Sequence, residues 1–100
     1  MLRISIQEEP AAVTLKLEGK VSGLWTGEFG RAWEKLAPSL GSRKLTVDLC
    51  GLGFVDAHGM QLLREIHEKT QAVFLTDSPL TKYFAEQATS TISGNGKKGA

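Results

Sequence analysis

The most specific local pattern in this chain is LTVDLCGLGFVDAHGM, which runs from Leu45 to Met60. In residues 45–50 apolar side chains alternate with polar ones, which is the period of a strand with one buried face. The glycines that follow predict a tight turn, and a second short apolar run leads to Asp56-Ala57-His58-Gly59. Asp56 is suited to cap the first amides of a helix that runs from about Gly59 to Lys69.

Two strands are expected before this stretch, because Leu2, Ile4 and Ile6 alternate with polar residues and residues 13–17 do the same. The connection through Pro10 makes them an antiparallel hairpin. From about Trp25 the apolar period changes to that of an amphipathic helix, capped by Ser22 or Thr26 and ended near Pro38.

After the central pattern, the apolar run at residues 72–75 is short enough for a strand. Ser78 and Pro79 then predict the start of a last helix, because serine caps helices and proline fits the first helical position. The predicted buried face of this helix consists of Leu80, Tyr83, Phe84 and Ala88.

The elements therefore follow the order ββαβαβα. Strands joined through helices lie parallel, so we predict an α/β domain with a mixed sheet whose helices lie mainly on one face. This domain should span residues 1–88. Residues 89–100, rich in Gly, Ser and Lys, predict a flexible tail.

Composition excludes several classes of function. The chain has 100 residues, of which 41% are hydrophobic, so one core is expected, and its net charge of +1 gives no bulk attraction to nucleic acid or to an anionic membrane. Its single cysteine cannot form an intrachain disulfide, which favours a reducing cytoplasm. We find no signal peptide and no apolar run of membrane-spanning length, so we expect a cytoplasmic protein that does not insert into membranes.

Three patterns could carry chemistry. Cys50 and His58 could form a nucleophile and base, Asp56 and His58 could bind a metal with His67, and Gly94 to Gly99 spells G-x-G-x-x-G. The Cys50 and His58 pair lacks a third group to orient the base. In the metal pattern, His67 would point away from the turn that holds Asp56 and His58. In the glycine pattern, no strand precedes Gly94. We therefore predict no catalytic, metal or cofactor site, and a protein that is not an enzyme.

The central pattern resembles the signature of the STAS family, named for sulphate transporters and anti-sigma-factor antagonists. The resemblance covers residues 2 to 88 and rests on Gly19-Lys20-Val21-Ser22, on Leu45 to Gly59, and on the spacing to the strand at residues 72–75. It implies a protein-binding module that docks on a nucleotide-dependent kinase, where phosphorylation of a serine breaks the docking.

His58 stands at the position that the resemblance assigns to the phosphorylated serine. It is therefore the phosphoacceptor-equivalent residue, but a serine kinase cannot modify it. Ser22 also stands where the family commonly has an acidic residue, and the closing strand and helix often seen in the family are missing after Ala88. The resemblance thus implies docking that is not switched at position 58.

The resemblance predicts a regulatory protein-protein interaction module of the anti-sigma-factor antagonist type, involved in transcription regulation in a bacterium. Its partner would be an anti-sigma factor or a related kinase-type ATPase. The alternative is a STAS subunit of a larger assembly, such as a lipid-transport ATPase complex or a stress-signalling complex, and a weak homodimer is left open. The predicted partner-binding residues are Asp56, Ala57, His58, Gly59, Met60, Val21, Ser22 and Trp25.

Overall fold

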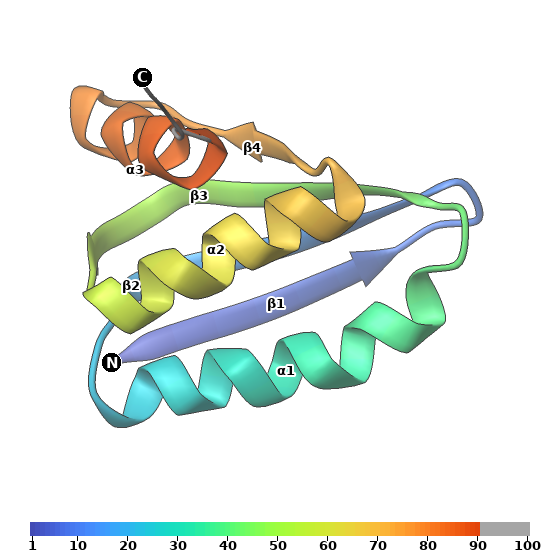
Figure 1. Cartoon of the computed structure of the whole chain (residues 1–100), viewed down its shortest axis with the longest axis horizontal. Helices are drawn as coiled ribbons and strands as arrows, with labels where there is room; N and C mark the ends of the chain where they lie inside the picture. Colours follow the sequence, from blue (N-terminus) through green and yellow to red (C-terminus); the bar gives the residue numbers. More distant parts are fainter. Residues whose placement is uncertain (91–100) are drawn as a thin grey trace, which may run out of the picture.

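A four-stranded mixed sheet carries three helices in the predicted order ββαβαβα (Figure 1). The computed structural model describes residues 1–90. The elements are β1 (Leu2–Glu8), β2 (Ala12–Val21), α1 (Leu24–Leu40), β3 (Lys44–Val55), α2 (Ala57–Thr70), β4 (Val73–Leu75) and α3 (Pro79–Thr89).

The sheet has the order β1-β2-β3-β4. β1 and β2 form the predicted antiparallel hairpin, whereas β2 pairs with β3, and β3 with β4, in parallel. Each parallel pair is joined through a helix, as a parallel connection requires. The predicted fold class is therefore confirmed.

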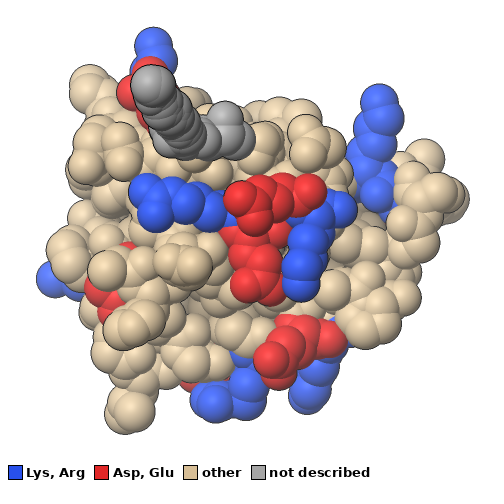
Figure 2. All heavy atoms as spheres, viewed as in Figure 1, with Lys and Arg blue, Asp and Glu red and all other residues tan. Residues whose placement is uncertain are grey.

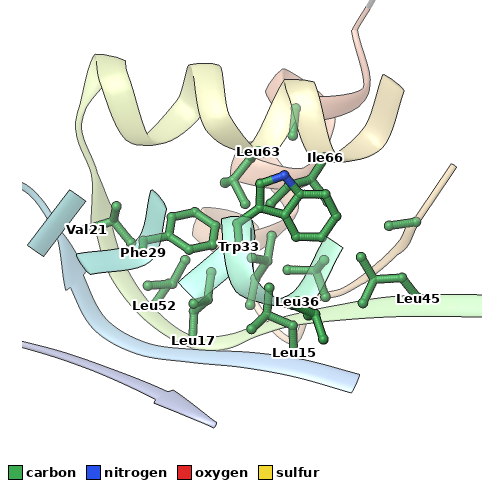
Figure 3. Close-up of a cluster of buried hydrophobic side chains, with 14 of the residues drawn as sticks. Leu15, Leu17, Val21, Phe29, Trp33, Leu36, Leu45, Leu52, Leu63 and Ile66 are labelled. Atoms are coloured by element: carbon green, nitrogen blue, oxygen red, sulfur yellow. The ribbon is translucent and has the colours of Figure 1, made fainter. Parts of the chain in front are cut away.

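The core lies between one face of the sheet and the helices. Alternate residues of β2 and β3, such as Leu15, Leu17 and Val47, are fully buried, and the residues between them are only partly covered. Figure 3 shows how Phe29 and Trp33 of α1 and Leu63 and Ile66 of α2 meet these strand residues. One face of the sheet thus carries the helices, as its alternating pattern predicted.

The tight turn predicted after Cys50 does not exist. β3 runs without a break to Val55, and two register shifts against β2 absorb the extra residues. At the first shift Leu17 alone faces both Leu49 and Cys50. A bulge of this kind bends and twists a strand without ending it, and glycines are frequent in such places.

Helix α1 differs from its prediction at both ends. It begins at Leu24 after Gly23, with no hydrogen bond from its own cap side chain, so neither Ser22 nor Thr26 caps it. At the other end it passes through Pro38 and reaches Leu40. An interior proline costs a helix roughly 3 kcal/mol, but this extension places Leu40 in the core.

Helix α3 begins as predicted. Ser78 accepts a hydrogen bond from the Thr81 amide, the Thr81 hydroxyl oxygen accepts one from the Ser78 amide, and Pro79 occupies the first turn. The prediction of its buried face was partly wrong. Leu80 and Tyr83 are exposed, whereas Thr81 is buried with Phe84 and Ala88.

The described chain ends one residue after α3. Thr89 is the last residue of this helix, and the predicted domain boundary at residue 88 stays a prediction. The remainder of the predicted tail, with its glycine motif, lies outside the described residues except for Ser90. Within residues 1–90, none of the helices combines the length and the apolar character needed to cross a bilayer.

Candidate functional site

Asp56 lies at the junction of β3 and α2 and bonds to three parts of the chain. Its carboxylate accepts a hydrogen bond of 2.7 Å from the Gly59 amide, which caps α2 as predicted. The same carboxylate accepts bonds from the Gly23 amide at 3.2 Å and from the Thr26 hydroxyl at 3.0 and 3.1 Å. Its own amide donates to the Val21 carbonyl at 2.8 Å.

Asp56 therefore serves the start of α1 as well as that of α2. The first amides of a helix have no partner within the helix, and α1 has no cap side chain of its own. Gly23 holds φ at 57°, a left-handed conformation that costs glycine little, and this presents its amide to Asp56. One carboxylate thus joins two helix N-termini that are more than thirty residues apart in sequence.

These bonds also set the charge of Asp56. Burial is the largest single influence on the pKa of Asp56 and raises it, whereas the hydrogen bonds from Gly59, Thr26 and Gly23 lower it. Together the bonds outweigh burial, so the pKa of Asp56 lies below its ordinary value of 3.8. The carboxylate is charged at neutral pH, which suits its position at two positive helix ends.

Gly59 allows α2 to approach the ends of two strands. A Cβ atom at this position would lie 2.6 Å from Cγ1 of Val21 and 3.0 Å from Cγ1 of Val55. Gly59 is buried. Gly59 is therefore required for the close packing of α2 against the ends of β2 and β3.

Apolar side chains surround this junction and face solvent. Leu24, the first residue of α1, is 89% exposed, Phe54 is 47% exposed and Trp25 is 38% exposed. Ala57 and His58 are also exposed, and Ser22 and Met60 are partly so. Phe54 pairs with the exposed Lys20, so it lies on the sheet face that carries no helix, and we call the other six residues the turn surface.

A shallow hollow of about 500 Å³ adjoins the turn surface. Its lining includes Leu24, Trp25, Gly27 and Arg31. The helix side of the molecule otherwise carries acidic and basic side chains next to one another, without a large area of one sign (Figure 2). The turn surface is thus distinguished by apolar exposure and not by charge.

The structure separates the eight predicted partner-binding residues into two groups. Val21 and Gly59 are buried, so they shape the turn surface from beneath and do not reach a partner. The other six, Asp56, Ala57, His58, Met60, Ser22 and Trp25, are exposed or partly exposed around the junction.

The sequence prediction missed Leu24 and Phe54. Phe54 stands in a strand run and Leu24 one residue before a helix face, so both resembled core residues. The signal that could have found Leu24 is the helical period, which places it on the side of α1 opposite the buried Phe29, Trp33 and Leu36.

Cys50 and His58 do not form a catalytic pair. Cys50 lies in β3, and the five extended residues to Val55 alone span roughly 16 Å. The hydrogen bond with Asp48 and then burial raise the pKa of the Cys50 thiol, which makes it a poor nucleophile.

The candidate metal ligands Asp56, His58 and His67 do not come together as a group of three. Among residues 1–90, no group of three or more His, Cys, Asp or Glu side chains could hold a metal ion. The ring of His67 lies instead against Phe74, with 6.1 Å between the centroids.

No protein-family model matches this chain, and no curated protein matches it. Among solved structures, the chain is similar to an uncharacterised protein of the DUF3478 family from Shewanella loihica PV-4, described as having a SpoIIAA-like fold. The TM-score is 0.57 at 13% identity, and the match covers 99% of this chain and 85% of that chain. The SpoIIAA-like fold is the STAS fold, so the likeness supports the predicted architecture.

Replacement of Gly59 by alanine should destabilise the protein by about 1–3 kcal/mol, because the new methyl group would overlap Val21. Gly53→Ala is the matched control, since a Cβ atom there would meet only the Gly19 carbonyl, at 3.8 Å. Urea unfolding followed by circular dichroism measures both variants. Equal free energies of unfolding for the two would contradict the close packing of Gly59.

Acid should weaken the native protein partly through Asp56. Its pKa is lower when folded than when unfolded, so its stabilising contribution is full above the unfolded value and is lost as pH falls through the folded one. We expect Asp56→Asn to cost about 1 kcal/mol at neutral pH and to reduce the loss of stability between about pH 5 and about pH 2.

Glu68→Gln, which removes one exposed charge from α2, is the control for this experiment and should keep the native pH profile. Urea unfolding at several pH values provides the measurement. If Asp56→Asn kept the native acid dependence, the hydrogen bonds to Asp56 would not stabilise the charged form.

Proposed function

We propose that this chain is a regulatory protein-protein interaction module of the anti-sigma-factor antagonist type. In this proposal the turn surface binds an anti-sigma factor or a related kinase-type ATPase. The SpoIIAA-like fold supports the class of module, and the apolar exposure around Asp56 supports the location of the binding surface.

The observation that carries the proposal is the exposure of Leu24. This side chain is 89% exposed at the first position of α1, beside Trp25 and within the segment that Asp56 holds. Burying one leucine against a partner is worth about 1.5–3 kcal/mol, and tryptophan is enriched among the residues that dominate binding energy. Leu24 and Trp25 would therefore be the anchors of the interface.

The polar part of the interface would come from the first turn of α2. His58 is exposed there, and its ring would make contact with a partner through stacking or hydrogen bonding. Because position 58 has no hydroxyl group, binding would not be switched by phosphorylation at this residue. The partner would remain docked as long as both proteins are present.

The proposed module binds and does not catalyse. Asp48 raises the pKa of the Cys50 thiol, and the Asp48 carboxylate also accepts a hydrogen bond from the Cys50 amide, five residues before the end of β3. Its place in β3 fits a structural role better than a reactive one.

The double variant Leu24→Ala/Trp25→Ala should bind a purified anti-sigma-factor ATPase from the same organism at least about thirtyfold more weakly than the native chain. Both side chains are exposed, so stability should change little. Isothermal titration calorimetry with and without ATP measures the affinity, and thermal unfolding checks the fold.

Tyr83→Ala is the matched control, because Tyr83 is an exposed aromatic residue on α3. It should leave the affinity unchanged. If Tyr83→Ala weakened binding while the double variant kept the native affinity, the interface would lie on α3. That result would refute the turn surface as the docking site.

The variant His58→Ser should gain a phosphate group when incubated with the cognate kinase and ATP, whereas the native chain should not. A phosphate at position 58 would lie at the N-terminus of α2, where unpaired amides and the helix dipole favour an anion. Intact-protein mass spectrometry detects the added phosphate. Equal labelling of native and variant protein would mean that another hydroxyl, such as that of Ser22, Thr26 or Ser78, is the acceptor.

A further inference from the structure

Strand β1 forms one edge of the sheet over its whole length of seven residues. Its register with β2 is unbroken from Leu2 to Glu8, so it contains no bulge. It also contains no proline, and its charged residues, Arg3 and Glu8, stand near its two ends. Proteins commonly protect edge strands with bulges, prolines or charged residues, or by keeping them short. The other edge strand, β4, has only three residues.

Hydrogen bonds at the two ends of the hairpin show which groups of β1 face outward. The Glu9 amide donates to the Ala12 carbonyl, and the Lys20 amide donates to the Met1 carbonyl. Alternate residues of an antiparallel pair bond to each other, so the odd-numbered residues of β1 bond to β2. The amides and carbonyls of Leu2, Ile4, Ile6 and Glu8 therefore point away from the sheet.

The same edge is apolar on its helix side. Ile4 is partly buried and Ile6 is 43% exposed, and both line an open groove of about 450 Å³ between β1 and α1. Ala32 and Leu36 of α1 also line this groove, whose rim includes Glu28, Arg31 and Lys35.

We propose that a second copy of this chain pairs with β1 in antiparallel fashion, with the two-fold axis passing through Ser5. This register places Ile4 opposite Ile6 of the second copy, and Leu2 opposite its Glu8. Every outward amide and carbonyl of β1 then has a partner. The isoleucines stay on the helix side, as they must, because a shift of one residue would turn them to the opposite face.

The flank of α1 is self-complementary in the same arrangement. β1 and α1 run in the same direction (Figure 1), so the two-fold axis also makes the two α1 helices antiparallel. α1 contacts both β1 and β2, and helices placed over adjoining hairpins would lie about 10 Å apart, a normal packing distance.

Charge favours this second copy over an unrelated strand. In an antiparallel pair of α1 helices, Glu28 lies near Lys35 of the second copy, with Ala32 close to the axis. Lys35 forms no ion pair within residues 1–90, and Glu28 bonds only to the exposed Arg31. The two Glu28 to Lys35 pairs would close the rim of the groove on both sides.

Sedimentation velocity and amide hydrogen exchange of the purified chain test this proposal without any partner protein, so their result is independent of the proposed function. As concentration rises, the mass should move from 10.8 kDa toward twice that value. The Ile4 and Ile6 amides should then exchange more slowly, whereas those of Ser5 and Gln7, already bonded to β2, should not change.

Lys35→Glu should weaken the dimer by at least about tenfold, because it places like charges across the axis. The double variant Glu28→Lys/Lys35→Glu should restore it. Ile6→Pro, which removes an outward amide that β2 does not use, should abolish the dimer, and Tyr83→Lys on α3 should leave it intact.

A chain that stays monomeric up to about 1 mM, where even weak association is visible, would overturn the proposal. So would a dimer in which the Ile4 and Ile6 amides exchange as fast as in the monomer. If Ile6→Pro unfolds, the charge swap at positions 28 and 35 still decides the outcome, because both residues are on the surface of α1.

Discussion

The carboxylate of Asp56 is the interaction on which the rest of the structure depends. It caps α2, accepts the first free amide of the α1 segment and binds the Thr26 hydroxyl, while its own amide continues the pairing of β3 with β2. The sheet, both central helices and the turn surface therefore meet at one residue. Leu24 and Trp25, the first two residues of α1, are exposed beside this junction.

What could be predicted from the sequence was determined by local contacts. The start of α3 was predicted from Ser78 and Pro79, which are neighbours in the chain, and the structure adds Thr81 to the cap. The cap of α1 comes from Asp56, 33 residues beyond Gly23, and no local pattern contains it. The continuity of β3 was missed for the same reason, since a bulge is defined by the opposite strand and glycines alone suggest a turn.

The candidate site shows the same division. The central pattern identified the helix start at Asp56 and thereby the centre of the turn surface. It could not show that Gly59 packs closely against Val21 and Val55. That contact arises only because α2 crosses the ends of two strands and leaves no room for a side chain at position 59. The exposure of Leu24 and Phe54 was not predicted either, since leucine and phenylalanine are residue types typical of a core.

The hydrogen bonds of the junction pass through Asp56, Gly59, Gly23 and Thr26, and none of them involves the side chain of position 58. A substitution at this position therefore leaves these hydrogen bonds in place, although His58 also favours the charged form of Asp56 and lies in the exposed turn. The side chain at position 58 can therefore change the chemistry that the exposed turn presents while the hydrogen bonds of the junction stay in place. His58 is then one of many residues that the same architecture could carry at this exposed turn.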